Sequence, residues 1–308
     1  MGKPTNPEPD RLSANAYAAR RPSPYQEQPV STPSSERPIT EQVRHRVDDR
    51  GIAWITLDRP DVKNAISPDQ RNRVIALLGE ASADLGVRVV VLGATGDAFC
   101  TGADLRARSV PAPRPDDAPA RGVGEIAKMI RDGAQAMVAA VMDCEKPVIA
   151  AVSGTAAGIG AHLAFACDLV IAAEGVRFIE VFVRRGLVPD GGGAYLLPRM
   201  VGIQKAKELL FFGDDIAATE ALALGLVNRV VPADEFEGAV DEWAGRLAVA
   251  PTRALALTKA LVNRSLDGDR ATAFAEEAMA QELNMGTVDA NEGIAAFVER
   301  RTPTYRGW

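Results

Sequence analysis

The sequence is poor in the side chains that bind metals or form disulfides. Its 308 residues include two histidines, His45 and His162, and three cysteines, and neither a CxxC nor an HExxH pattern occurs. A site built from several histidines is therefore impossible, and we expect no metal. The cysteines are odd in number and each has apolar neighbours, which predicts buried thiols in a reducing compartment and hence a cytoplasmic protein.

The chain also lacks long apolar runs and an excess of positive charge. Its longest apolar runs are far shorter than the roughly 20 residues that a membrane span needs, so we expect no membrane association. A formal net charge of −6 argues against nucleic acid as a partner.

Residues 1–40 hold eight of the 20 prolines and show no periodic apolar pattern and no secretory signal. This composition predicts a disordered tail.

The remainder of the chain alternates between strand-like and helix-like patterns. Short apolar runs alternate with helical spacing over residues 41–232, which predicts an α/β core, and helical patterns alone fill residues 233–308. Ser67 followed by Pro68 predicts the start of a helix. The proline-rich stretch 106–122 predicts a long surface loop, and a long helix is expected over residues 123–143.

Glycine-containing turns follow predicted strands at residues 101–105 and 154–160. Two backbone N–H groups that converge from separate turns would form an oxyanion hole, although each turn taken alone favours the interpretation as a tight strand-to-helix connection. Gly158 and Gly160, with Glu180 about 20 residues later, also resemble the start of a dinucleotide-binding fingerprint. Leu163 occupies the position of the third glycine, however, where a small residue is needed.

Several longer motifs carry a resemblance to one family. The chain resembles the crotonase (enoyl-CoA hydratase/isomerase) superfamily from about residue 42 onward. The motifs occur in the family's order: GIAWITLDRPDVKNAIS at 51–67, AFCTGADL at 98–105, KPVIAAVSGTAAGIGAHLAFACDLVIA at 146–172, GLVPDGGGAYLLPR at 186–199, AKELLFFGDDIAATEALALGLVNRVV at 206–231 and EGIAAFVERRTPTYRG at 292–307.

The resemblance implies a fold and a substrate class. The expected fold is an α/β crotonase (ClpP-like) spiral of ββα units over residues 41–232, followed by a helical C-terminal trimerisation region over 233–308. A homotrimer or a dimer of trimers is therefore expected. The implied substrate is an acyl-CoA thioester, with coenzyme A as part of the substrate and no separate cofactor.

The resemblance also assigns residues. The thioester oxygen of an enolate-like intermediate would be held by the backbone N–H groups of Ala103 and Ile159. The residues expected to lie at the CoA site are Lys63, Ala65, Ala103, Asp104, Leu105, Arg106 and Ile159.

The two glutamates of hydratases are absent from their family positions. The first position holds His162 and the second holds Phe182. Glu180 lies two residues from Phe182, and on a helix this spacing would turn its side chain roughly 200° away. Asp190 in GLVPDGGG is the remaining acidic candidate, because family members that shift double bonds often carry an acidic residue there.

Two residues keep alternative roles at this stage. Asp190 is either the acid/base of the reaction or the N-cap of a helix that starts at Gly191. His162 shares a helix face with Ile159 and is expected to face the pocket, either as a catalytic group or in a structural polar contact. We therefore predict Δ3/Δ2-enoyl-CoA isomerisation by a single aspartate. The alternatives are enoyl-CoA hydration and a catalytically silent acyl-CoA-binding protein.

Overall fold

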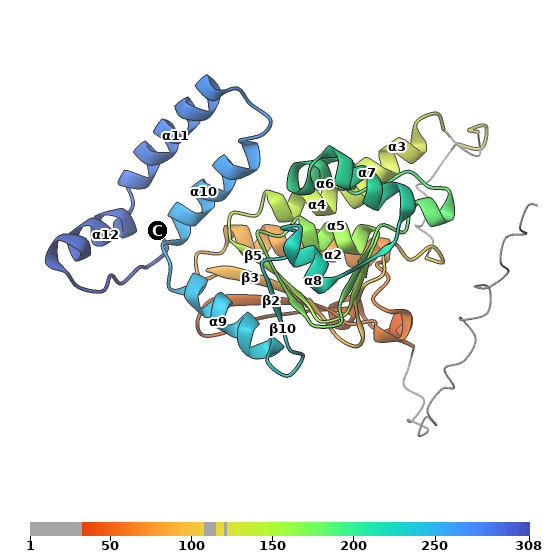
Figure 1. Ribbon diagram of the computed structural model, residues 1–308, viewed down its shortest axis with the longest axis horizontal. Helices are drawn as coiled ribbons and strands as arrows, with labels where there is room; N and C mark the ends of the chain where they lie inside the picture. Colours follow the sequence, from red (N-terminus) through yellow and green to blue (C-terminus); the bar gives the residue numbers. More distant parts are fainter. Residues whose placement is uncertain (1–32, 108–114, 120–121) are drawn as a thin grey trace, which may run out of the picture. The chain divides into compact units, whose positions relative to one another are not determined.

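The computed structural model describes residues 33–107, 115–119 and 122–308 (Figure 1). Most of the predicted tail, and part of the predicted loop over 106–122, lie outside the described residues. Residues 33–40 contradict the tail prediction, because Ser34–Glu36 forms the 3-10 helix η1 and Ile39–Gln42 forms helix α1. The hydroxyl of the buried Ser34 accepts a hydrogen bond from Arg59 Nε at 3.4 Å. The compact unit therefore begins at Pro33.

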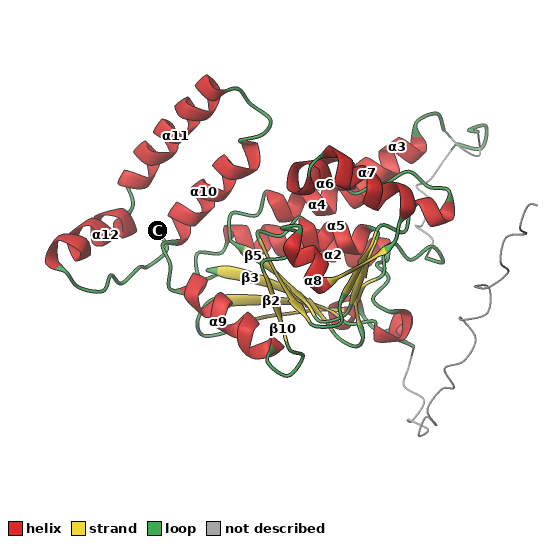
Figure 2. Ribbon diagram, in the orientation of Figure 1, coloured by secondary structure: helices red, strands yellow, loops and turns green. Residues whose placement is uncertain are grey.

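A six-stranded sheet in the order β1-β2-β3-β5-β7-β10 forms the centre of the fold (Figure 2). β1 runs antiparallel to β2, and the other neighbours are parallel. Every residue of β5 is buried, as expected for an apolar strand covered on both faces. The strands are β1 Val43–Val47, β2 Ile52–Leu57, β3 Val89–Ala94, β5 Val148–Val152, β7 Leu169–Ala173 and β10 Arg229–Val231.

A smaller sheet in the order β4-β6-β8-β9 places the predicted site turns beside each other. Its strands are β4 Ala98–Cys100, β6 Thr155–Ala157, β8 Arg177–Ile179 and β9 Asp215–Ala217. β4, β6 and β8 run parallel, so their carboxyl ends lie at one edge. The turn after β4 and the turn after β6 therefore lie next to each other.

Helix α2, Pro68–Ala83, begins where the sequence predicts. The Ser67 hydroxyl accepts a hydrogen bond from the backbone N–H of Gln70, and the Gln70 side chain accepts one from the backbone N–H of Ser67. This capping box satisfies two backbone donors at the start of the helix. The apolar stripe predicted for this helix is buried in the core at Val74, Leu77, Leu78 and Ala81.

The long helix expected over 123–143 is interrupted. It consists of α3 Glu125–Ile130, a π-helical turn η3 Arg131–Gln135 and α4 Ala136–Met142. A Cβ added to Gly133 would lie 2.7 Å from Arg71 Nη1, so the π turn packs tightly against α2. The spacing of apolar residues along the sequence, from which the continuous helix was predicted, contains no information about this contact with α2.

The remaining helices of the core flank the two sheets (Figure 1). They are α5 Ile159–Phe165, α6 Gly193–Val201, α7 Ile203–Phe212, α8 Ala218–Ala223 and the 3-10 turns η2 Pro60–Val62 and η4 Val183–Arg185.

None of the helices in the described residues has the length and apolar character that a membrane span needs. The same residues contain no cluster suited to a metal ion. The three cysteines are free and buried, as predicted.

The core extends beyond the boundary predicted at residue 233. Helix α9, Phe236–Ala248, packs against β2, β3, β5 and β7, and its residues Phe236, Val240 and Ala244 belong to the main apolar core. The separate helical region therefore begins at α10, Thr252–Arg264. The Lys259 ammonium on α10 lies 2.8 Å from Asp168 Oδ2 and holds this helix to the core.

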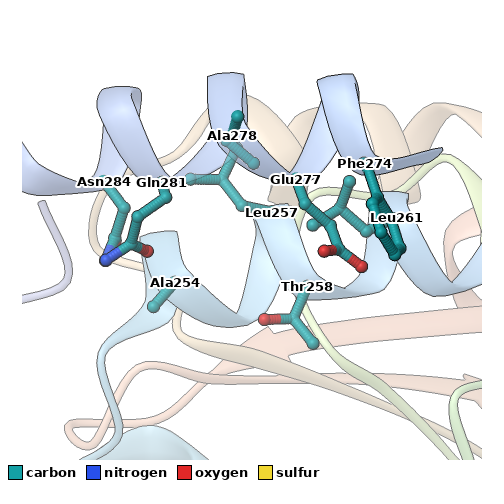
Figure 3. A pocket seen from close by; sticks show the side chains of 10 residues that line it. Ala254, Leu257, Thr258, Leu261, Phe274, Glu277, Ala278, Gln281 and Asn284 are labelled. Carbon is teal, nitrogen blue, oxygen red and sulfur yellow. The ribbon is translucent and has the colours of Figure 1, made fainter. Parts of the chain in front are cut away.

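Helices α10, α11 (Arg270–Met285) and α12 (Val288–Glu299) complete the chain. A groove of about 590 Å³ lies between α10 and α11 (Figure 3). Its lining contains none of the residues predicted for the site. The lining side chains are Ala254, Leu257, Thr258, Leu261, Phe274, Glu277, Ala278, Ala280, Gln281 and Asn284.

Candidate active site

The turn after β4 meets the start of α5 at very close range. A Cβ added to Gly160 would collide with the carbonyl oxygen of Cys100 at the end of β4. Gly102 has a φ of +103°, which L side chains rarely adopt, and a Cβ there would lie 3.2 Å from the carbonyl oxygen of Ala157 at the end of β6. The absence of side chains at these glycines therefore lets the two turns approach each other.

The backbone N–H groups of Ala103 and Ile159 have no hydrogen-bond partner among the described residues. Ala103 forms a parallel bridge with Ile66, in which Ile66 N–H donates to Gly102 O at 2.8 Å and Asp104 N–H donates to Ile66 O at 3.0 Å. The polar groups of Ala103 itself point away from Ile66. Ile159 is the first residue of α5, where helices leave N–H groups unpaired.

Ala103 and Ile159 line one cavity of about 250 Å³. Much of its wall is apolar, and Asp190, Asp104 and Arg71 supply charged groups. The lining residues are Ile66, Ser67, Pro68, Arg71, Ala103, Asp104, Leu105, Ala107, Met129, Ile130, Ala134, Met137, Ile159 and Asp190. An apolar cavity with a few polar groups is typical of a small-molecule site.

Asp190 is a cavity residue and does not cap a helix. Helix α6 begins at Gly193 with Gly192 as its N-cap, and no side chain caps it. The alternative prediction, a helix that starts at Gly191 with Asp190 as its cap, is therefore wrong. Asp190 Oδ1 is buried without a hydrogen-bond partner in the described structure. Burial raises the pKa of the Asp190 carboxyl, and the nearby His162 opposes part of that rise.

His162 lies behind the cavity wall, which differs from its expected position facing the pocket. Its side chain is 0 % exposed and stacks on Phe182 with ring centroids 5.3 Å apart. Its Nε2 lies 2.9 Å from Glu180 Oε2. A Cβ on Gly191 would lie 3.5 Å from Ile159 Cγ1 and 3.6 Å from His162 Nδ1. Ile159 and the Gly191 turn therefore separate the imidazole from the cavity.

The side chain of Glu180 lies in a different direction from the one predicted, because residues 180–182 do not form the helix that was assumed for them. The helical spacing assumed for residues 180–182 would turn Glu180 away from Phe182. Strand β8 ends at Ile179 instead, and the chain then turns so that Glu180 is 2 % exposed and contacts His162. The signal present in the sequence was a single charged residue within the apolar run Phe178–Phe182.

Asp104 is held by a buried guanidinium. Arg59 Nη2 lies 3.2 Å from Asp104 Oδ2, and both side chains are 5 % exposed. Burial alone would raise the pKa of Asp104, but hydrogen bonds from the Arg106 backbone and side chain and from Arg59 outweigh it and lower the pKa. Sequence reasoning did not identify Arg59, which connects the loop after β2 to the turn that bears Ala103.

The remaining residues predicted for the CoA site divide into two groups. Leu105 lines the cavity together with Asp104, and Arg106 lines a neighbouring surface hollow. Lys63 and Ala65 do not line the cavity. They belong to the loop beside it, where the Lys63 carbonyl accepts hydrogen bonds from the backbone N–H and hydroxyl of Thr101 at 3.3 and 3.1 Å.

Comparisons with known proteins point to one family. A family model described as enoyl-CoA hydratase/isomerase matches residues 48–307. A Rhodobacter capsulatus protein named "Probable enoyl-CoA hydratase" is 37 % identical over 265 residues, which cover 86 % of this chain and 98 % of that protein. An Escherichia coli protein named 1,2-epoxyphenylacetyl-CoA isomerase is 32 % identical over 259 residues, which cover 84 % of this chain and 96 % of that protein.

A solved structure gives the same result for the fold. The crystal structure of an enoyl-CoA hydratase from Bacillus anthracis matches with a TM-score of 0.77 and 32 % identity, covering 87 % of this chain and 100 % of that one. The predicted α/β crotonase fold is thereby confirmed. The chain belongs to the enoyl-CoA hydratase/isomerase family, and it is an enzyme of that family.

Proposed function

We propose that this enzyme moves the double bond of an acyl-CoA thioester from the Δ3 to the Δ2 position, with Asp190 as its acid/base. The observation that carries the proposal is the position of Asp190. Its partly buried carboxylate lines the same cavity as Ala103 and Ile159 and has an oxygen without a partner in the described structure. The two carboxylates of the hydratase pattern are replaced by His162 and Phe182.

The proposed reaction needs one base and one oxyanion site. Asp190 takes a proton from C2 of the 3-enoyl thioester, and the electron pair of the broken C–H bond moves into the thioester carbonyl. The N–H groups of Ala103 and Ile159 donate hydrogen bonds to the resulting oxyanion, which contributes about 3–4 kcal/mol per donor where it has been measured. The protonated Asp190 then returns the proton to C4, and the double bond forms between C2 and C3.

The substrate of this proposal is the CoA thioester itself, so the reaction uses no resident cofactor. The apolar side chains Met129, Ile130 and Met137 are suited to an acyl chain. The segment Ala103–Arg106 would lie along the pantetheine and nucleotide of CoA, with Lys63 and Ala65 beside it. A cytoplasmic location stays a prediction, supported by the free and buried thiols.

One experiment separates the possible activities. The protein and its Asp190→Asn variant are incubated with 3-enoyl-CoA and with 2-enoyl-CoA, and conjugated thioester and 3-hydroxyacyl-CoA are measured separately. We expect wild-type isomerisation, and a loss of about 10²–10⁴-fold in kcat for the variant. Hydration of 2-enoyl-CoA that survives in the variant would contradict the proposal. Binding of CoA esters without turnover of either substrate would indicate a silent binder.

We further propose that α10–α12 mediate self-association into a trimer or a dimer of trimers. Several large apolar side chains of these helices are exposed in the single chain, among them Phe297 at 84 % and Val298 at 74 %. A soluble monomer rarely exposes extended apolar surface of this kind, and such surface commonly marks an interface. No residue of α11 is buried within the chain.

A further inference from the structure

A buried ionisable pair lies behind the proposed catalytic cavity and has no role in the reaction described above. His162 Nε2 and Glu180 Oε2 are 2.9 Å apart, and their side chains are 0 % and 2 % exposed. The residues come from different elements, since His162 lies on α5 and Glu180 follows β8. A charged group that is removed from water to this extent destabilises the fold unless it is paired with an opposite charge. Even a buried ion pair often adds nothing to the free energy of unfolding.

The surrounding residues fix the imidazole in one orientation. Phe182 stacks on one face of the ring, with an interplanar angle of 11°. On the side of Nε2, a Cβ added to Gly193 would collide with the ring. On the side of Nδ1, a Cβ added to Gly191 would lie 3.6 Å from that atom. With Nε2 held by Glu180, the Nδ1 atom is therefore directed at the Asp190–Gly191 turn.

Three polar atoms of this group are buried without a hydrogen-bond partner in the described structure. They are His162 Nδ1, Glu180 Oε1 and Asp190 Oδ1. Native proteins rarely leave buried polar atoms unsatisfied, so three such atoms in one group need an explanation, and a role in catalysis is one that fits a group beside the cavity. His162 is also the side chain whose charge acts on the Asp190 carboxylate. The other charged groups at the cavity are Arg71 and Asp104, and Asp104 is occupied by Arg59 and Arg106.

We propose that Glu180 and His162 are positioning residues for Asp190: the Glu180 carboxylate holds the His162 imidazole so that the Nδ1 side of the ring is directed at the Asp190 turn. This inference rests on the proposed role of Asp190 as the acid/base. In the reaction, the pair stabilises the ionised form of Asp190 that removes the proton. In place of the two glutamates of the hydratase pattern, this chain would have the Glu180–His162 pair, which acts on the carboxylate of Asp190.

The direction of the effect follows from the charges. Burial raises the pKa of Asp190, and His162 lowers it. Removal of His162 leaves burial unopposed, so the pKa of Asp190 rises. Removal of the Glu180 carboxylate takes away the group that holds the imidazole in place, so the effect of burial is again unopposed and the pKa of Asp190 rises in this variant too. Because both changes act through the same imidazole, their effects on Asp190 are not additive.

The test compares His162→Gln, Glu180→Gln and the double variant with the wild-type protein. The carboxyl of Asp190 is titrated by ¹³C NMR, with Asp190→Asn used to assign its signal, and the acidic limb of kcat/KM is measured on 3-enoyl-CoA. Glu174→Gln is the matched control, because Glu174 is exposed on the surface. Near-UV circular dichroism identifies the variants that are folded.

We expect the Asp190 carboxyl to titrate at a higher pH in each single variant than in the wild type, and no higher in the double variant. The acidic limb should shift in the same direction, whereas Glu174→Gln should match the wild type. A wild-type titration of Asp190 in either folded single variant would overturn the inference, and so would an additive shift in the double variant.

The two proposals can fail separately. If Asp190→Asn keeps isomerase activity but the NMR titration shifts as expected, the pair acts on Asp190 and the proposed function is wrong. If Asp190→Asn is inactive and the titration does not shift, the proposed function stands and the positioning role is wrong.

Discussion

The guanidinium of Arg59 and the carboxylate of Asp104 form a buried ion pair, with Nη2 and Oδ2 3.2 Å apart. Arg59 also donates hydrogen bonds to the Ala65 carbonyl at 3.1 Å and to Gln70 Oε1 at 3.0 Å. The pair therefore joins the start of α2 to the turn that carries the Ala103 N–H.

Asp104→Asn is expected to destabilise the fold by about 3 kcal/mol, because it leaves the Arg59 charge buried without a counter-charge. Urea unfolding at pH 7 measures this difference. The pKa of Asp104 is lowered in the folded protein, so its stabilisation is present above the pKa of an unfolded aspartate and is lost as the pH falls through the folded value. The gap between variant and wild type should therefore close in acid.

The exposed pair Arg264–Glu276 supplies the control for that measurement. Glu276→Gln should change the stability by less than about 1 kcal/mol, as is typical of surface ion pairs. Equal effects of Asp104→Asn and Glu276→Gln would show that the buried pair is not structurally important.

Asp190→Asn is expected to stabilise the protein at neutral pH while it slows isomerisation by about 10²–10⁴-fold. The raised pKa of Asp190 means that the folded state binds its proton more tightly than the unfolded state. Stability therefore falls as the pH rises from the unfolded to the folded pKa, and asparagine removes this loss. Thermal unfolding should show an increase on the order of a few degrees in Tm at pH 8 and a smaller one at pH 4. A lower Tm at pH 8 would contradict the assignment of a destabilising carboxylate.

Gly193→Ala is expected to displace the His162 ring, because the new Cβ would collide with the imidazole. Both the Tm and the isomerase activity should fall, since overpacking typically costs about 1–3 kcal/mol. Gly238→Ala on α9 is the matched control, because a Cβ there meets nothing within 4 Å and alanine favours the helix. If Gly193→Ala were as stable as Gly238→Ala and the wild type, the conclusion that Gly193 packs closely against the His162 ring would be wrong.

Phe297→Glu is expected to weaken self-association without unfolding the chain, because Phe297 is 84 % exposed in the single subunit. Sedimentation of the wild type should give a trimer or a hexamer, and the variant should shift toward smaller species. Leu85→Glu, at an exposed position near the end of α2, should leave the assembly intact. A wild-type monomer at micromolar concentration would contradict the proposed oligomer.

Features set by local sequence could be predicted well. Ser67, Pro68 and the apolar spacing after them define the start and the buried face of α2, because capping and helical periodicity act within a few residues. The buried strands could be recognised for a similar reason. The turns that carry Ala103 and Ile159 could be placed from the resemblance to a family.

Features set by contacts between distant segments could not be predicted. Lys63 and Asn64 adopt positive φ, and the Asn64 side chain forms hydrogen bonds with three backbone groups, those of Arg59, Thr95 and Ala98. Helix α9 carries the same kind of apolar stripe as α10, and only the folded chain shows that α9 covers the central sheet. Glu180 was misplaced because the end of β8, and not a helix, directs its side chain.

The close approach of Gly160 to the Cys100 carbonyl has a consequence for how this sequence can diverge. The N–H groups at Ala103 and Ile159, which have no partner within the described part of the chain, belong to the backbone, so any residue except proline can supply them. Substitutions at those two positions can reshape the cavity and leave both donors in place. The positions that tolerate least change are the neighbouring glycines Gly102 and Gly160, where an added Cβ would meet the backbone of another segment. Distant relatives are therefore better recognised by the glycines that set the spacing of the two turns than by the residues that bear the donors.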